Sequence, residues 1–203
     1  MNKLPVWAIA RLRMATDGTG VTTLVTAAGC PLRCKYCINP HSWNGAAKTE
    51  LLTAEALYGR VKIDDLYFQA TNGGVTFGGG EPLQYAPFLP EFRALCGDKW
   101  RLYAETSLNV SEENVRVAAE ALDGFIVDIK DTDPAIYRNY TGCENERVMR
   151  NLSFILEKLG PERITVRIPL IPEYNTEDDV RSSAALLTKM GFTKLDIFPY
   201  IIR

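Results

Sequence analysis

Short runs of apolar and β-branched residues recur along the chain, and turn residues bound most of them. Runs of this length that are apolar throughout are typical of strands buried on both faces of a sheet. The pattern predicts an edge strand at 4–14 and six further strands at 21–28, 74–77, 101–105, 124–130, 163–171 and 194–199. Pro5 restricts the first strand to an edge because proline donates no hydrogen bond to a sheet.

Amphipathic helices are predicted between the strands. Thr53, Ser111 and Thr176 are N-cap residues for three of them, and another begins at Asp133-Pro134 and ends near Gly142. The apolar positions expected to face the core are Leu57 and Val61; Phe88, Phe92 and Leu95; Val115, Ala118, Ala119 and Leu122; Val148, Leu152, Ile155, Leu156 and Leu159; and Val180, Ala184 and Leu187.

Strands that alternate with helices predict an α/β fold with a parallel sheet. If the strands follow one another in order, right-handed crossovers put every helix on the same face and the sheet curls. We therefore expect an open, partial (β/α)6 barrel with the helices on its outer face. A flat, doubly wound sheet has the same sequence pattern and stays an alternative. Residues 1–203 contain no linker or repeat and are expected to form a single domain.

Composition and net charge limit the class of protein, its binding partners and its cellular location. The chain has 203 residues, of which 46% are hydrophobic and 24% charged, as in ordinary globular proteins. A net charge of −2 offers no basic surface for nucleic acid or an anionic membrane. No apolar run reaches membrane-spanning length, and the N-terminus lacks the apolar segment of a signal peptide. A cytoplasmic protein, expected to be a monomer, fits these properties.

Three cysteines, Cys30, Cys34 and Cys37, lie within eight residues at the end of the strand at 21–28. A four-iron cluster usually takes four thiolates, so a loop with three leaves one iron open for a ligand. Two alternatives exist: a zinc site with His41 as fourth ligand, and a chance grouping of inert thiols. Cys96 and Cys143 stand alone, and we expect a buried helix cysteine and a loop thiol.

Unusual polar residues follow the other predicted strands at their carboxyl ends. A glycine run, 78–80, ends one strand, Glu105 and Thr106 end the next, and Asp128 with Lys130 ends the one after. Arg167 lies late in the strand at 163–171. Charges inside apolar runs are costly to bury without partners. Their recurrence at one rim favours a shared polar ligand, while the alternative is a structural ion pair among Asp128, Lys130 and Arg167.

The spacing Cys-x3-Cys-x2-Cys, with Tyr36 before the last cysteine, resembles the signature of the radical S-adenosylmethionine (SAM) superfamily. In that family a [4Fe–4S] cluster binds the amino and carboxylate groups of SAM at its open iron, and the reduced cluster splits SAM into methionine and a 5′-deoxyadenosyl radical. Gly79, Gly80 and Glu81, followed by Pro82, resemble the motif that receives the methionine amino group.

Further segments resemble the activating enzymes of glycyl radical enzymes. They are residues 17–20, 75–81, 127–130, 137–142, 166–172 and 198–200, spread over nearly the whole chain. The resemblance implies that Lys130 and Arg167 bind SAM, with Lys130 at its carboxylate, and that Tyr36 and Asn39 line the cofactor. It also implies a monovalent cation beside SAM on Glu105, Thr106 and Asp128, although Glu105 replaces the aspartate of the family.

The implied activity is hydrogen-atom abstraction from a backbone glycine of a partner glycyl radical enzyme under anaerobic conditions, with a reduced flavodoxin or ferredoxin as electron donor. Ile201 stands where such enzymes often carry histidine, and the sequence stops at Arg203 without a closing helix. A barrel more open on one side is therefore expected. A radical SAM enzyme acting on a peptide or small molecule, and a metal-binding or electron-transfer module without SAM chemistry, stay as alternatives.

Overall fold

The computed structural model describes residues 2–14 and 16–202. Outside the described residues lie Met1, Ala15 and Arg203, the first and last of which are the ends of the predicted domain. The described strands form one sheet in the order β3-β1-β2-β4-β5-β6-β7-β8. Their bounds are β1 Lys3–Arg13, β2 Thr22–Ala27, β3 Glu50–Thr53, β4 Gly74–Gly79, β5 Arg101–Thr106, β6 Gly124–Asp128, β7 Ile164–Leu170 and β8 Lys194–Pro199.

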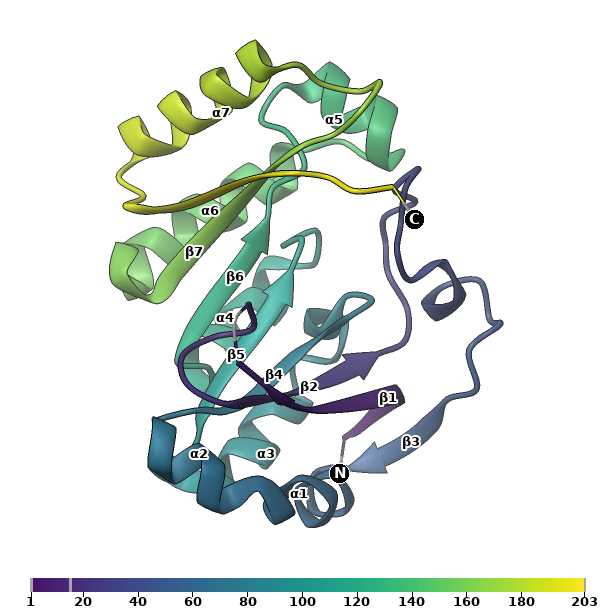
Figure 1. The fold of residues 1–203 in the computed structure, drawn as a ribbon, viewed down its shortest axis with the longest axis vertical. Helices are drawn as coiled ribbons and strands as arrows, with labels where there is room; N and C mark the ends of the chain where they lie inside the picture. Colours follow the sequence, from purple (N-terminus) through teal and green to yellow (C-terminus); the bar gives the residue numbers. More distant parts are fainter. Residues whose placement is uncertain (1, 15, 203) are drawn as a thin grey trace.

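The sheet is parallel from β2 through β4, β5, β6 and β7 to β8, and these six strands lie side by side in the order in which they occur along the chain. β1 pairs antiparallel with β2 on one side and with β3 on the other. β3 and β8 lie at the two edges of the sheet, so the curled sheet does not close on itself (Figure 1). The predicted open, partial barrel of six parallel strands is confirmed, with an antiparallel extension at one edge.

The helices are α1 Ala54–Val61, α2 Asp65–Thr71, α3 Phe88–Cys96, α4 Glu112–Ala121, α5 Pro134–Thr141, α6 Glu146–Leu159 and α7 Glu177–Met190. Helix α1 packs on α3, α3 on α4 and α4 on α6, in the order of the chain. This row lies along the outer side of the sheet (Figure 1), whereas a doubly wound sheet would divide its helices between two faces. None of the described helices combines the length and apolarity needed to cross a membrane.

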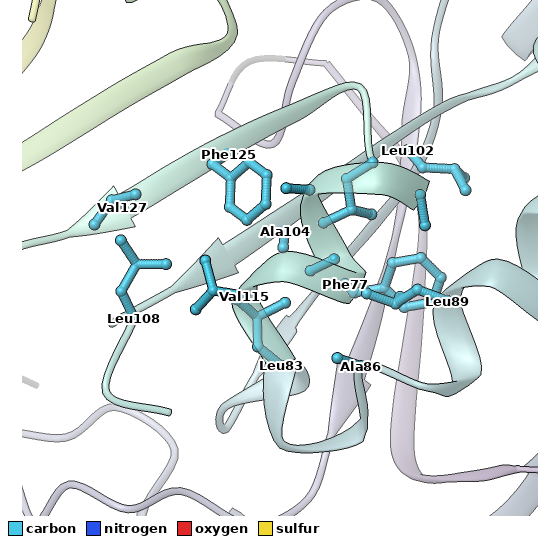
Figure 2. Close-up of a cluster of buried hydrophobic side chains, with 14 of the residues drawn as sticks. Phe77, Leu83, Ala86, Leu89, Leu102, Ala104, Leu108, Val115, Phe125 and Val127 are labelled. Atoms are coloured by element: carbon cyan, nitrogen blue, oxygen red, sulfur yellow. The ribbon is translucent and has the colours of Figure 1, made fainter. Parts of the chain in front are cut away.

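The hydrophobic core lies between the outer face of the sheet and this row of helices. Phe77, Leu102, Ala104, Phe125 and Val127 alternate along β4, β5 and β6 and are all buried. Figure 2 shows them packed against side chains that include Leu83, Leu89 and Val115. Since side chains alternate across a strand, the residues between them face the concave side of the sheet, where polar side chains such as Glu105 gather.

Capping explains where several helices begin. The hydroxyls of Thr53, Ser111 and Thr176 each accept a hydrogen bond from a backbone N–H of the first turn, and Asp133 accepts two at the start of α5. Gly142 follows α5 in the left-handed conformation. The four predicted helix starts and the predicted end at Gly142 are confirmed. Caps can be predicted from sequence because each depends on only a few neighbouring residues.

Three predictions about the elements need correction. β3 and α2 were not expected, because both are short and carry no periodic apolar pattern. Leu95 was expected in the core but is 37% exposed, and Cys96, 5% exposed, occupies the inward position at the end of α3. The strand predicted at 124–130 ends at Asp128, so Lys130 belongs to the following turn.

Candidate active site

The cysteine loop, residues 30–37, leaves the C-terminal end of β2, the end where ligands bind in folds of this kind. All three of its cysteines are free and half-buried. Gly29 has a φ of 87°, which suits glycine, and lets the chain turn sharply out of the strand before Cys30.

Helix α5 holds the middle of this loop. The backbone N–H of Arg33 donates to the carbonyl of Thr141 at 2.9 Å, and that of Lys35 donates to the carbonyl of Tyr140 at 3.1 Å. These carbonyls are free because a helix leaves its last C=O groups without internal partners. The two bonds lie on either side of Cys34 and fix its place against the end of α5.

Burial raises the pKa of Cys30 to about 12 and that of Cys34 to about 11. Iron binds thiolates, so cluster assembly has to release protons from these thiols. Within residues 2–14 and 16–202, no three Cys, His, Asp or Glu side chains converge as ligands of one metal ion. A four-iron cluster takes each thiolate at a different iron, so its ligands need not converge on a point.

The described residues do not bring His41, the proposed fourth zinc ligand, together with the cysteines as ligands of one metal ion. The ring of His41 packs edge-on against Trp7, with the ring centroids 4.5 Å apart. Cys96 lies in the core at the end of α3, and the Cys143 thiol donates to the carbonyl of Pro31 at 3.6 Å, so the expectations of a buried helix cysteine and a loop thiol are confirmed. The remaining donor set, three thiols on one loop, fits an iron–sulfur cluster.

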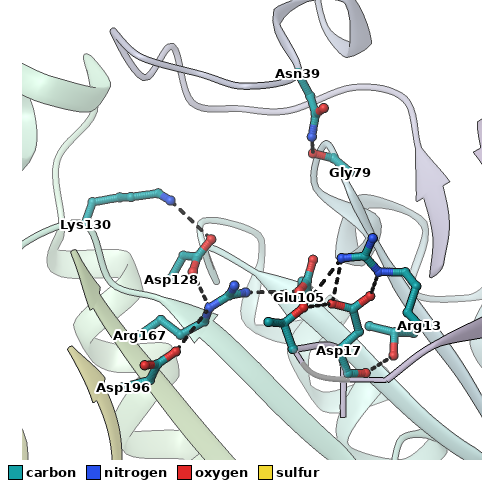
Figure 3. Close-up of polar contacts among 11 residues, drawn as sticks. Arg13, Asp17, Asn39, Gly79, Glu105, Asp128, Lys130, Arg167 and Asp196 are labelled. Carbon is teal, nitrogen blue, oxygen red and sulfur yellow. Dashed lines mark hydrogen bonds and ion pairs between the residues drawn. The ribbon is translucent and has the colours of Figure 1, made fainter. Parts of the chain in front are cut away.

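The glycine run lies directly beside the cysteine loop. The N–H of Gly80 donates to the carbonyl of Ala27, and the N–H of Glu81 donates to the carbonyl of Gly29 at 2.7 Å. A Cβ atom at Gly80 would clash with that Gly29 carbonyl, and Gly79 has a φ of 92°. Asn39 donates from its side chain to the Gly79 carbonyl at 3.3 Å (Figure 3). Glycine is required here because two backbones meet.

The Glu81 carboxylate is fully buried and accepts four hydrogen bonds, from the Leu83 N–H, the Thr106 hydroxyl and both the N–H and the hydroxyl of Ser107. Burial raises its pKa. The structure thus places this side chain between the ends of β4 and β5, where it joins the two strands, and not toward an ammonium on the concave side. A contact from this segment to SAM would use backbone groups.

A chain of ion pairs crosses the concave face of the sheet (Figure 3). Lys130 Nζ lies 3.2 Å from Asp128 Oδ2, and Arg167 Nε lies 3.7 Å from Asp128 Oδ1. Arg167 also contacts Glu105 at 3.0 Å and Asp196 at 3.8 Å. The structure therefore brings together the predicted residues Lys130, Asp128, Arg167 and Glu105. The ion pairs expected if these charges had a purely structural role are present as well.

These groups strongly affect one another's ionisation. Burial would lower the pKa of Lys130, but Asp128 and the nearby Cys34 outweigh it and the pKa is raised, so Lys130 stays charged. Burial raises the pKa of Glu105 to about 7, although Arg167 opposes the shift. The site thus holds a fixed ammonium beside Cys34. A buried cation of this kind suits a carboxylate ligand.

Lys130 is held in an unusual backbone conformation with a φ of 60°. It is the central residue of a three-residue turn, in which the Asp131 N–H donates to the Ile129 carbonyl at 2.7 Å. Asp131, 2% exposed, accepts hydrogen bonds from the side chains of Asn175 and Ser183. No sequence pattern predicts this supporting network, since Asn175 and Ser183 lie far from Asp131 along the chain.

Glu105, Thr106 and Asp128, the predicted cation ligands, do not share one orientation. Glu105 and Asp128 both face Arg167, whereas the Thr106 hydroxyl donates to Glu81 at 2.7 Å. A cation between the two carboxylates would compete with the Arg167 guanidinium. The cation site stays a prediction.

Other residues of the site come from distant segments. The hydroxyl of Tyr36 donates to Glu173 at 2.6 Å, and the hydroxyl of Tyr200 donates to the Tyr36 carbonyl. Arg13 and the buried Asp17 form an ion pair, and the hydrogen bond from Arg13 to Asp17 raises the pKa of the Arg13 guanidinium, with a smaller contribution from Glu105. Arg13 was not predicted as a site residue, because on the sequence it reads as the polar end of an edge strand.

A cavity of about 440 Å³ opens on the concave face at the opposite end of the strands. Its lining includes Gly124 and Lys194, the first residues of β6 and β8. Arg167, which lies further along β7, also contributes to the lining. The cysteine loop does not line it. Arg167 therefore lies between this cavity and the cysteine end of the sheet.

Comparison with known proteins agrees with this geometry. A model of the radical SAM superfamily matches residues 24–186. The chain is 31% identical to the pyruvate formate-lyase-activating enzyme of Clostridium pasteurianum over 186 residues, which covers 91% of this chain and 77% of that protein. It is 24% identical to the indoleacetate decarboxylase activating enzyme of Tractidigestivibacter scatoligenes, over 91% of this chain and 79% of that protein.

A solved structure of similar fold is Streptococcus suis SuiB bound to S-adenosylmethionine, with a TM-score of 0.67 and 14% identity. The alignment covers 88% of this chain and 40% of SuiB. Radical SAM proteins use a [4Fe–4S] cluster and SAM, and the three free cysteines with Lys130 beside Cys34 provide suitable groups for both. The chain therefore belongs to the radical SAM superfamily and, within it, to the family of activating enzymes.

Proposed function

We propose that this protein is an activating enzyme for a glycyl radical enzyme. One observation supports this most directly: the cysteine loop and the Lys130–Asp128–Arg167–Glu105 chain of ion pairs occupy the same end of a radical SAM sheet. The relatives that cover most of the chain are activating enzymes. In this role the protein passes one electron to SAM and creates a radical on a second protein.

Cys30, Cys34 and Cys37 would hold the cluster. A bound and reduced cluster would supply the single electron for cleavage of the carbon–sulfur bond of SAM, the chemistry that leads to removal of a hydrogen atom from a backbone glycine. Lys130 would bind the SAM carboxylate, and the backbone carbonyls beside Gly79 and Gly80 would receive its ammonium. None of these residues has to transfer a proton, so the chemistry needs no general base.

The remaining groups would orient the cofactor. Arg167 is fixed by Glu105 and Asp128 and presents its guanidinium to the concave face. Tyr36 and Asn39 lie next to the cluster cysteines in sequence, and both are anchored by hydrogen bonds. A monovalent cation on Glu105, Thr106 and Asp128 would add positive charge, provided that SAM binding moves Arg167.

A glycyl radical enzyme is the proposed macromolecular substrate, and a reduced flavodoxin or ferredoxin is the proposed electron donor. We place the reaction in the cytoplasm, where SAM and such low-potential carriers occur together. We expect the protein to act as a monomer that forms a transient complex with its substrate.

The test is an anaerobic reaction of the cluster-loaded protein with SAM, a chemical reductant and a candidate glycyl radical enzyme. We expect 5′-deoxyadenosine and methionine by chromatography, and a glycyl radical signal by electron paramagnetic resonance (EPR). Cys34→Ala should lose both. Cys96→Ala is the matched control, because Cys96 lies in the core away from the loop, and it should retain both.

Two other outcomes would change the conclusion. If 5′-deoxyadenosine forms without a protein radical on any glycyl radical enzyme, the protein is a radical SAM enzyme for a peptide or small molecule. If the purified protein contains zinc and no sulfide, and no SAM is cleaved, the iron–sulfur assignment itself is wrong.

A further inference from the structure

Tyr137, on α5, is fully buried with 0% of its surface exposed. Its hydroxyl finds no hydrogen-bond partner anywhere in residues 2–14 and 16–202. A buried hydroxyl without a partner is unfavourable, and natural proteins rarely leave one in place. Where one persists near a cofactor site, a group of the bound cofactor can be its missing partner.

The position of Tyr137 points to the cysteine loop. One turn later on the same helix face, Tyr140 and Thr141 offer the carbonyls that bind the N–H groups on either side of Cys34. Cys143, just beyond the helix, donates to the Pro31 carbonyl of the same loop. Helix α5 is therefore docked on this loop with Tyr137 on the docked face.

The charged groups around the hydroxyl agree with this position. After burial, Cys34 is the strongest influence on the pKa of Tyr137, followed by Lys130. A tyrosine hydroxyl carries one proton, so toward a negatively charged group it acts as the donor. A sulfide of the bound cluster would be such a group.

We propose that the Tyr137 hydroxyl donates a hydrogen bond to a sulfide of the bound cluster, on the side of Cys34, and thereby tunes the reduction potential of the cluster. This inference rests on the iron–sulfur assignment made above. Tyr137 is a positioning and tuning residue, since it acts on the cluster and touches neither SAM nor the glycine.

The expected effect follows from charge. A sulfur bound to iron gains negative charge when the cluster is reduced, so a hydrogen bond to it becomes stronger in the reduced state. Hydrogen bonds to sulfur are among the factors that set iron–sulfur potentials. Loss of the donor should therefore shift the reduction potential to a more negative value.

The first experiment measures that potential in the absence of SAM and of any partner protein. Clusters are assembled with iron and sulfide, and reduction is followed by EPR during an anaerobic redox titration. Tyr137→Phe removes only the hydroxyl and should give a more negative potential at equal iron content. Tyr58→Phe is the control, because Tyr58 stacks on Trp100 beside the outer helices, and it should leave the potential unchanged.

An unchanged potential in Tyr137→Phe would overturn the inference. If the shift has the same size in Tyr58→Phe, it does not come from the Tyr137 hydroxyl and the inference also fails. If Tyr137→Phe leaves the potential unchanged and the wild-type protein cleaves SAM, only the inference about Tyr137 fails and the proposed function is unaffected. A wild-type protein that assembles no cluster would overturn both.

A second measurement does not depend on the stability of Tyr137→Phe. 3-Fluorotyrosine is placed at position 137, and electron–nuclear double resonance detects the fluorine beside the reduced cluster. We expect a resolved fluorine coupling at position 137 and none with the same residue at Tyr58, which stacks on Trp100 beside the outer helices. No coupling at position 137 would mean that the ring lies too far from the cluster.

Discussion

The backbone of Lys130 has a conformation that residues with a side chain rarely adopt, with a φ of 60°. Such a conformation costs on the order of 1–3 kcal/mol and persists only where the surroundings enforce it. Here the buried Asp131, with Asn175 and Ser183, provides that support. The strain is concentrated at the residue proposed to bind the SAM carboxylate.

Lys130→Met should weaken SAM binding, because the ammonium is lost while most of the side-chain volume is kept. Charge-assisted hydrogen bonds contribute roughly 1.5–3 kcal/mol, so the dissociation constant should rise about 10- to 100-fold. Calorimetric titration of SAM into the cluster-loaded protein measures it. Lys189→Met, on the exposed side of α7, is the control, and equal affinities of the two variants would contradict the assignment of Lys130.

Gly80→Ala should disturb the cysteine loop, because the added methyl group meets the Gly29 carbonyl beside Cys30. Backbone atoms on both sides cannot move independently, so cluster incorporation should fall. Iron and sulfide analysis after assembly measures this.

Gly59→Ala is the matched control for that change. Gly59 lies in α1 with open space around its Cβ position. Alanine there should raise stability by up to about 1 kcal/mol because of its higher helix propensity. Normal iron content in Gly80→Ala would show that the two backbones can separate at no cost.

At the scale of elements, Asp123 connects the start of strand β6 to helix α3 and to strand β5. It lies just before β6, forms ion pairs with Arg93 of α3 and Arg101 of β5, and accepts a hydrogen bond from the Leu102 N–H at 2.8 Å. Burial would raise the pKa of Asp123, but these donors outweigh it, and the pKa lies below the ordinary value of 3.8. The ionised form therefore stabilises the fold.

A lowered pKa gives a defined pH dependence. The stabilisation is present above the ordinary pKa and is lost as the pH falls through the folded-state pKa. Asp123→Asn should lower the free energy of unfolding by about 1–3 kcal/mol at pH 7, and the difference from wild type should shrink below about pH 4. Urea unfolding followed by circular dichroism measures both. A constant difference across this range would mean that ionisation of Asp123 contributes nothing.

Much of the architecture could be predicted from the sequence, because the signals are local. The run 21–28 and the caps Ser111 and Thr176 each specify their element without reference to the rest of the chain. β3 and Leu95 could not be predicted in the same way. β3 exists because β1 offers it a hydrogen-bonding edge, and Leu95 is displaced because Cys96 fits the inward position of the last turn.

In the site, too, residues with a local signal could be predicted from the sequence, and residues whose role depends on distant partners could not. Cysteine spacing and polar residues at strand ends identified Cys34, Lys130 and Arg167, since each sits at a position that the pattern marks as unusual. The role of Glu81 was less accessible, because its four donors come from the loops after β4 and β5 and become neighbours only when the strands pair. Tyr137 belongs to the segment 137–142 that resembles the activating enzymes, but no pattern in the sequence indicates that its hydroxyl is buried without a partner among the described residues.

At the scale of the whole molecule, most of the hydrophobic core lies outside the cluster loop, which contributes Leu32 to the core while Cys30 and Cys34 pack against it. The core lies between the sheet and the outer helices, whereas the loop leaves the end of β2 and is fixed to the end of α5. Removal of iron should therefore leave the fold in place. After chelation we expect an unchanged far-ultraviolet circular dichroism spectrum and new protease cleavage confined to residues 30–47.

Cleavage spread evenly over the chain after chelation, or loss of the helical spectrum, would show that the fold depends on the cluster. Zinc-dependent domains that unfold without their metal are the opposite case, because there the ligands replace a core. A variant such as Val127→Ala is the useful comparison. It should lower the free energy of unfolding by about 2 kcal/mol through loss of core volume and leave iron binding intact.

Alternation along each strand has one more consequence. Residues that stabilise the protein point outward to the helices, and those available to a ligand point inward, so neighbouring positions in the sequence are subject to different selection. New specificity can evolve through changes at inward positions while the outward ones keep the chain folded. Descendants of one ancestral gene can in this way acquire unrelated substrates without passing through unfolded intermediates.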